Sequence, residues 1–140
     1  MTAPQTDTAP ASSTDRTATT AEPLASAARW LRVCTLADLD VERGSAVLLG
    51  EDQLALFRLA DGTIVATDNR DPYSGAQVMS RGIVGSRGEV PTVASPMFKQ
   101  VFDLRTGHCL DTKGKEPASL HLWPLLVRGH EVYVLHGGTW

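Results

Sequence analysis

The side chains best suited to metal or redox chemistry in this 140-residue chain are two cysteines and four histidines. Cys34 and Cys109 lie far apart, and no Cys-x-x-Cys, Cys-x-His or His-x-x-x-His spacing occurs. His108 adjoins Cys109, but neighbouring residues of a strand point to opposite faces and rarely bind one ion together. We therefore expect buried thiols without a disulfide, and surface imidazoles, with no metal bound by this chain. The other histidines are His121, His130 and His136.

Oxygen-based and glycine-based sites are the next candidates. Asn69 and Asp71 could offer oxygen ligands to calcium or magnesium, but they precede Pro72, where such side chains usually bond to nearby amides of a turn. The glycines between residues 82 and 88 lack the helix that a dinucleotide-binding loop must open, so we expect a tight connection with positive φ. A Ser-His-Asp arrangement stays open on spacing alone, yet no serine stands in a nucleophile elbow. We assign no catalytic residue.

The stretch from Thr92 to His108, TVASPMFKQVFDLRTGH, predicts two strands that hold a loop by its ends. Pro96 lacks the amide hydrogen that a central ladder needs, so the chain must leave the sheet there. The loop covers residues 97–100, and a turn at 105–107 follows the second strand. A rigid frame of this kind is how many proteins present a site.

Short strands account for most of the remaining chain. In the segment 53–59, Leu54 and Leu56 face one side while Ala55, Phe57 and Leu59 face the other, which indicates an interior strand. Asp61-Gly62 predicts a hairpin, and Pro124 predicts a bulge or an edge. Residues 68–88 show little periodicity, and a loop of that length is usually functional. The other expected strands are 30–34, 45–49, 63–68, 89–94, 101–103, 119–127 and 131–135, with a helical turn or loop at 36–39.

These elements predict an all-β protein, an antiparallel barrel or sandwich. Residues 1–29 are rich in Ala, Thr, Ser and Pro, and we expect a disordered tail before a domain at 30–140. The net charge of −3 and the lack of Lys/Arg clusters argue against nucleic acid. No apolar run approaches the roughly 20 residues that cross a membrane, and no secretory signal is evident, so we expect a cytoplasmic location.

The segment SPMFKQVFDLRTG resembles the second half of a Rieske iron–sulfur domain, in which a Cys-Pro-x-His-Gly loop precedes a phenylalanine, an aspartate and a Thr-Gly turn. Ser95 stands where that family has cysteine, and Phe98 where it has histidine. The first family loop, Cys-x-His, would fall on residues 69–71, so the vestigial ligand positions are Asn69, Asp71, Ser95 and Phe98. A two-iron Rieske centre needs two thiolates and two imidazoles, which these residues do not supply.

Three segments in order resemble one subgroup, the small subunit of assimilatory NAD(P)H-dependent nitrite reductase: Asp68 to Ala76, Ser80 to Gly85 and Ser95 to Leu104. The resemblance implies a Rieske-like fold with a small subdomain carrying loops 69–88 and 95–100. It also implies an accessory chain without a cofactor of its own. The partner would be a large catalytic subunit that carries siroheme, a [4Fe-4S] cluster and FAD, uses NAD(P)H, and reduces nitrite to ammonia.

The two loops also carry cations, Arg70, Arg81, Arg87 and Lys99, which form a basic patch if the loops meet. Arginine, methionine and aromatic residues are enriched at interfaces, whereas isolated surface charge is usually only solvated. Met79 is one of the apolar residues beside these cations in the sequence. Our hypothesis is that the end of the domain formed by the two loops contacts the large subunit. Alternatives are a Rieske-type [2Fe-2S] electron carrier with unusual ligands, or a stand-alone binding module. The expected partner-binding residues are Arg70, Tyr73, Arg81, Met97, Phe98 and Lys99.

Overall fold

The computed structural model describes residues 28–137, and the expected tail lies outside the described residues except for its last two positions. Within that range the chain is all-β, with two 3-10 helices, η1 (Leu36–Asp38) and η2 (Met79–Arg81). Trp30–His136 form one compact unit. The strands are β1 (Arg29–Thr35), β2 (Arg43–Leu49), β3 (Asp52–Arg58), β4 (Ile64–Asp68), β5 (Ile83–Arg87), β6 (Val90–Ala94), β7 (Val101–Asp103), β8 (Cys109–Asp111), β9 (Leu122–Trp123), β10 (Leu125–Arg128) and β11 (Glu131–His136).

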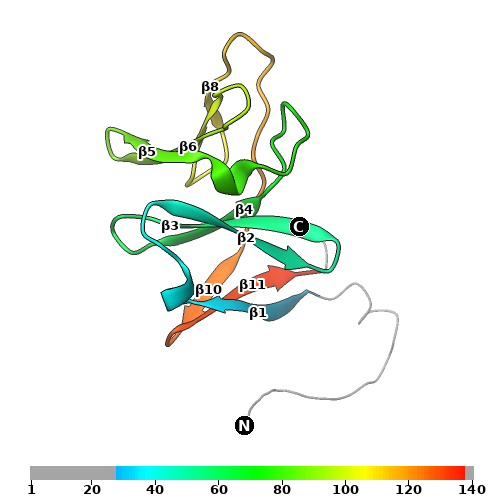
Figure 1. Ribbon diagram of the computed structural model, residues 1–140, viewed down its shortest axis with the longest axis vertical. Helices are drawn as coiled ribbons and strands as arrows, with labels where there is room; N and C mark the ends of the chain where they lie inside the picture. The colour runs from blue at the N-terminus through cyan, green and yellow to red at the C-terminus, as the bar shows by residue number, and fades with distance from the viewer. Residues whose placement is uncertain (1–27, 138–140) are drawn as a thin grey trace. The chain divides into compact units, whose positions relative to one another are not determined.

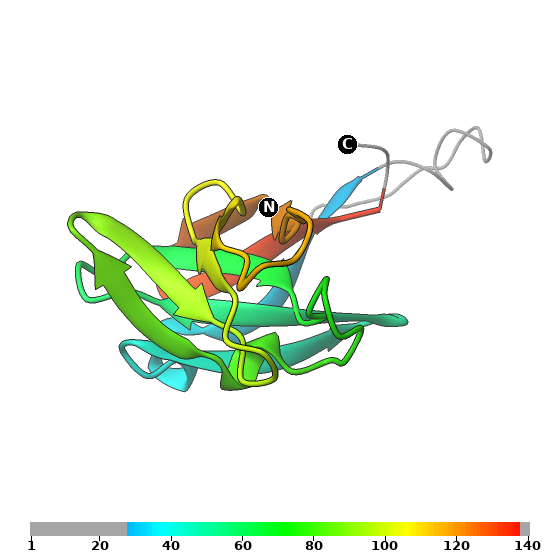
Figure 2. The same cartoon turned by 90° about the horizontal axis from the view of Figure 1, so that it is seen from above.

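The strands form three sheets with the orders β1-β11-β10, β2-β3-β4-β9 and β5-β6-β7-β8. The second and third sheets are antiparallel throughout. In both views the β5–β6 hairpin lies over the sheet that contains β3 (Figures 1 and 2). The β5–β8 sheet corresponds to the small subdomain that the family resemblance implied, with residues 95–100 between β6 and β7, and the all-β prediction is confirmed. Among residues 28–137, no helix is long and apolar enough to cross a bilayer.

Strand β3 lies between two separate cores and confirms the prediction of an interior strand. Ala55 and Phe57 pack in one core with Val93 and Phe102 of the β5–β8 sheet. Leu54 and Leu56 point the other way and pack with residues of β4 and β11. The four consecutive side chains from Leu54 to Phe57 are at most 1% exposed. The sheet that contains β3 is therefore the middle layer, and each neighbouring sheet covers one of its faces.

Two predictions of local structure need correction or refinement, and one short strand was not predicted. Residues 83–87, expected as loop, form β5, and 109–111 form the short strand β8. Neither segment alternates clearly between apolar and polar residues, because most of their side chains are exposed or half-exposed. The expected strand 119–127 is split at Pro124 into β9 and β10, which lie at the edges of two different sheets. The edge position of Pro124 agrees with its missing amide hydrogen.

The middle sheet also positions the first candidate loop, through a close approach at Gly44 of β2. A Cβ atom on Gly44 would lie 2.4 Å from the carbonyl oxygen of Ser80 and 2.8 Å from Cε1 of Phe57. Ser80 belongs to η2, and Met79 of the same helix is fully buried in the core that contains Phe57 of β3. The absent side chain at Gly44 therefore lets η2 lie directly on the sheet.

Replacement of Gly44 by alanine should lower the free energy of unfolding by about 1–3 kcal/mol, because the clash is with backbone that cannot move without shifting η2. Chemical denaturation would measure the change. Gly85→Ala is the matched control: it lies in β5, and its Cβ would meet only Thr92 Oγ1, at an ordinary 3.7 Å. Equal midpoints for the two variants would contradict the assigned role of Gly44.

Candidate functional site

The first candidate loop follows β4 and is held by two buried side chains, Asn69 and Asp71. The Asn69 Oδ1 atom accepts the amide of Ser80 at 2.7 Å, and its Nδ2 donates to the Gln77 carbonyl at 3.2 Å. Asp71 Oδ1 accepts the Tyr73 amide at 2.9 Å, and Oδ2 accepts the Ser74 hydroxyl at 3.0 Å. The structure confirms the interpretation of Asp71 as a turn residue, because its oxygen atoms accept local donors. Asn69 instead spans the loop, because it bonds to Gln77 and Ser80, which lie 8 and 11 positions further along the chain.

The second candidate loop, residues 95–100, is closed across its base. The Ser95 amide donates to the Gln100 carbonyl at 2.9 Å, and the Lys99 amide donates to the Ser95 carbonyl at 3.1 Å. The Ser95 hydroxyl also accepts the Met97 amide at 3.1 Å. Ser95 and Gln100 are fully buried, while residues 97–99 are exposed. The loop is thus a fixed base with an exposed tip.

The two loops meet through one buried hydrogen bond. Ser95 Oγ donates to Asp71 Oδ2 at 2.6 Å, although the two residues are 24 positions apart in the sequence. Both side chains have no solvent-exposed surface. With the donors from Tyr73 and Ser74, the carboxyl group of Asp71 receives three hydrogen bonds, and bonds to a carboxylate are stronger than those between neutral groups. Asp71 is therefore the group that ties the loops together.

The vestigial ligand positions do not fit a two-iron cluster. A Rieske centre requires two thiolates and two imidazoles, whereas Asp71 and Ser95 bond to one another and Phe98 has no ligating atom. Phe98 is 55% exposed rather than directed inward. Among residues 28–137, no group of three or more His, Cys, Asp or Glu side chains is arranged to hold a metal ion. No chemical step is assigned to a cluster.

Four of the six expected partner-binding residues carry exposed side chains on or beside the tip. Met97 is 46% exposed and, like Phe98 and Lys99, belongs to the second loop. Arg81 is the last residue of η2 and directly precedes Gly82. A Cβ on Gly82 would lie 2.7 Å from the carbonyl oxygen of Ala94, so Arg81 is close to the start of the second loop. Arg70, the fifth, is exposed on the first loop. We call the surface formed by Arg70, Arg81, Met97, Phe98 and Lys99 the loop surface.

Tyr73, the sixth residue, is half-buried and packs against the core. Its ring packs against Phe102 with centroids 6.1 Å apart, and its hydroxyl accepts the Ala118 amide at 3.0 Å. Burial of the hydroxyl, and its interaction with Cys109, raise the pKa of Tyr73. Tyr73 thus supports the first loop from inside.

Two side chains that the sequence placed near the loops lie elsewhere, and one was missed. Met79 is fully buried in the core. Arg87 lies at the far end of β5, where Nη2 is 3.6 Å from Asp111 Oδ2. Ile83, at the start of β5, is 61% exposed and pairs with Ala94 next to the second loop. The sequence analysis missed Ile83 because it assigned residues 83–87 to a loop instead of a strand.

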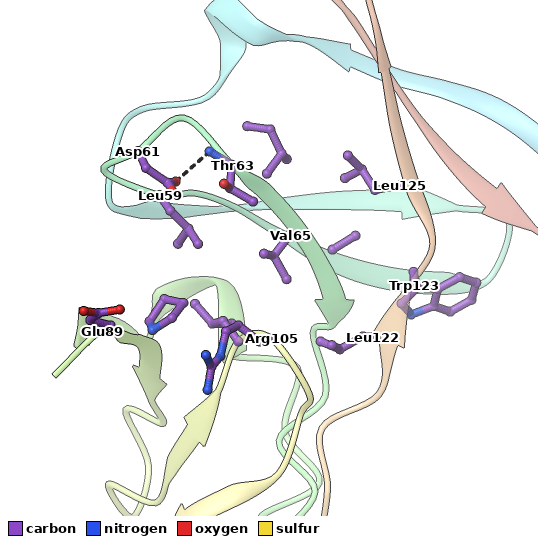
Figure 3. A pocket seen from close by; sticks show the side chains of 13 residues that line it. Leu59, Asp61, Thr63, Val65, Glu89, Arg105, Leu122, Trp123 and Leu125 are labelled. Atoms are coloured by element: carbon purple, nitrogen blue, oxygen red, sulfur yellow. Dashed lines mark hydrogen bonds between the residues drawn. The ribbon is translucent and has the colours of Figure 1, made fainter. Parts of the chain in front are cut away.

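A separate cleft of about 420 Å³ lies away from both loops. Figure 3 shows Asp61 and Glu89 at one end of the cleft and Trp123 at the other. The Thr63 amide donates to Asp61 Oδ1 at 2.9 Å and keeps the pKa of that carboxyl group low. None of the vestigial ligand positions or loop-surface residues lines the cleft. Its lining residues are Leu59, Asp61, Thr63, Ile64, Val65, Ala66, Glu89, Pro91, Leu104, Arg105, Leu122, Trp123 and Leu125.

Comparison with known proteins agrees with the all-β fold. Residues 29–135 match the Rieske-like [2Fe-2S] domain family, and the chain belongs to that family. Within it, the chain belongs to the small subunits of NAD(P)H nitrite reductase, which is an oxidoreductase. It is 36% identical over 84 residues to the nitrite reductase (NADH) small subunit of Escherichia coli K12, covering 59% of this chain and 78% of the relative.

Two further similarities extend this result. A crystal structure of a candidate NADH-dependent nitrite reductase small subunit from Mycobacterium tuberculosis has a TM-score of 0.72 and 42% identity, covering 81% of this chain and 99% of that chain. A nitrite reductase [NAD(P)H] large subunit from Klebsiella oxytoca is 40% identical over 113 residues, which are 81% of this chain but only 11% of the relative. This chain thus spans about a tenth of that large subunit.

Removal of the hydroxyl in Ser95→Ala should lower the free energy of unfolding by about 1–3 kcal/mol, because Asp71 loses a buried donor. Asp71→Ala should be at least as destabilising, and the double variant should fall short of the sum by about 0.5–3 kcal/mol. Urea denaturation of the four proteins measures this coupling. Ser86→Ala, at an exposed position of β5, is the control and should be near neutral. Strict additivity would show that the loops are joined by other contacts.

Proposed function

We propose that this chain is the accessory small subunit of a cytoplasmic NAD(P)H nitrite reductase that reduces nitrite to ammonia for nitrogen assimilation, and that it binds no cluster itself. The observation that carries the proposal is the buried hydrogen bond between Ser95 and Asp71. It joins the two loops of a Rieske-like domain directly, from one side chain to another, at two of the positions where the family has cluster ligands. The domain from residue 30 onward would act through binding rather than through electron transfer or catalysis.

The Klebsiella oxytoca relative supports a large-subunit partner. In that protein, a segment similar to this chain is part of one polypeptide described as a large subunit. Covalent linkage keeps two domains at high effective concentration, and separate chains need an interface to achieve the same association. We infer that this chain binds a large subunit, which would carry siroheme, a [4Fe-4S] cluster and FAD and take electrons from NAD(P)H.

The loop surface is the proposed docking surface. Met97 and Phe98 expose apolar area, and interfaces are enriched in aromatic residues, methionine and arginine. Arg70, Arg81 and Lys99 make no ion pair with another described residue, so their charges are available to a partner. Ile83 extends the exposed apolar area toward β5. We expect the large subunit to present carboxylates around an apolar surface.

Co-expression of this chain with the large subunit of the same organism tests the proposal. The chain should co-purify with the large subunit, whereas the chain alone should be colourless and contain far less than one iron per molecule. Affinity capture, a visible spectrum and an iron assay provide the measurements. A brown chain with about two irons per molecule would identify an electron carrier instead. Failure to capture the large subunit would leave a binding module with another partner.

Charge reversal locates the docking surface. Arg81→Glu should weaken binding of the large subunit by roughly tenfold or more at low salt, with most of the effect on the association rate and its salt dependence. Surface plasmon resonance at several salt concentrations measures both. Arg128→Glu is the matched control, because Arg128 is also exposed but lies on β10 of a different sheet. Similar losses in both variants would indicate a non-specific charge effect, and unchanged binding of Arg81→Glu would count against the loop surface.

A further inference from the structure

The tip of the second loop departs from the way this chain handles strained backbone elsewhere. Most described residues with positive φ are glycines, which adopt this conformation without a steric penalty. Three are not, and all three carry charged side chains: Glu42, Lys99 and Lys113. A non-glycine residue in this region is uncommon, because its Cβ crowds the following carbonyl group.

Closure of the loop imposes the positive φ at Lys99. Its φ is 67°, and its amide donates to the Ser95 carbonyl while the Ser95 amide donates to Gln100. Glycine would satisfy the same closure with less strain. The lysine side chain is therefore present although the backbone at this position favours glycine.

Gln100, the next residue, is a second departure from local stability. Its side chain is fully buried, and neither its amide nitrogen nor its amide oxygen has a hydrogen-bond partner among the described residues. Buried polar groups are otherwise nearly always paired. Two adjacent departures from local rules in one loop are typical of a functional site, where a protein gives up some stability.

Lys113 shows what a locally explained lysine with positive φ looks like. Its φ is 54°, its amide donates to Asp111 Oδ1 at 3.1 Å, and its Nζ lies 3.1 Å from Asp111 Oδ2. The aspartate thus holds both the backbone and the charge of Lys113. Lys99 makes no comparable ion pair with another residue that the structure describes. Its charge therefore has no partner of opposite charge within residues 28–137.

We infer that Lys99 recognises a carboxylate of the large subunit and is a main contributor to binding at the loop surface. The inference rests on the function proposed above. Exposed Met97 and Phe98 directly precede Lys99 at the tip of the same loop, so docking there would remove water near the lysine and strengthen a charge-assisted bond. The base of the loop is already fixed by Ser95 and Asp71, so little further ordering is needed on binding.

The test compares Lys99→Gly with Lys113→Gly in the full-length chain. Both variants relieve a positive φ. Lys99→Gly should raise Tm by roughly 2–6 °C in calorimetry. Lys113→Gly should raise it by less, because this variant also loses the ion pair with Asp111. Only Lys99→Gly should weaken binding of the purified large subunit, by about tenfold or more, with a smaller dependence on salt. A gain in stability together with a loss of binding is an outcome that a purely structural role for Lys99 does not produce.

Two more variants separate charge from loop flexibility. Lys99→Asn keeps a side chain that tolerates the left-handed region but removes the charge, so it should lose binding as Lys99→Gly does. Lys99→Arg keeps the charge and should retain most of the affinity.

The outcomes are distinct. If the wild-type chain does not bind the large subunit, the proposed function fails. If it binds and the glycine and asparagine variants bind within about twofold of it, the role of Lys99 alone is overturned. Unchanged binding with a raised KM for nitrite would place Lys99 at the substrate and would also overturn it. A lower Tm for Lys99→Gly would refute the strain argument.

Discussion

Strand β3 has no solvent-exposed face over the four residues from Leu54 to Phe57, and this constraint determines how the rest of the domain is arranged. A sheet with a strand of this kind must be covered on both sides. The β10–β11 hairpin and β1 cover the face formed by Leu54 and Leu56. The β5–β8 sheet covers the other face and brings the second loop next to the first. The two loops therefore meet because the sheet that carries the second loop must cover β3.

The contact between the two loops is made by side chains of the protein itself. The ferredoxin of carbazole 1,9a-dioxygenase from Nocardioides aromaticivorans shares the fold at 22% identity and a TM-score of 0.65. In the present chain, Asp71 and Ser95 place a short hydrogen bond between the loops, and three donors satisfy the carboxyl group. This bond fixes the position of one loop relative to the other. Fold similarity therefore indicates the frame and not the activity.

The sequence was informative where a local pattern has one physical solution. The alternation around Leu54, the proline at Pro124 and the turn residue Asp71 all led to correct predictions, because burial, a missing donor and local hydrogen bonding act over a few residues. It failed for β5, whose exposed residues lack a pattern, and for the burial of Met79, which depends on the approach of η2 to Gly44. The bond between Asp71 and Ser95 spans 24 positions, and no spacing rule predicts it.

The second loop combines a well-satisfied base with a poorly satisfied tip, and the two features are physically connected. Strain at Lys99 and the unpaired amide of Gln100 can persist only where the surrounding structure fixes the backbone. The buried Ser95 and its bond to Asp71 provide that support. A tip that relaxed freely would avoid the strain, and it would also lose the defined orientation of its exposed side chains. Rigidity at the base thus allows this protein to keep a conformation at the tip that stability alone would not select.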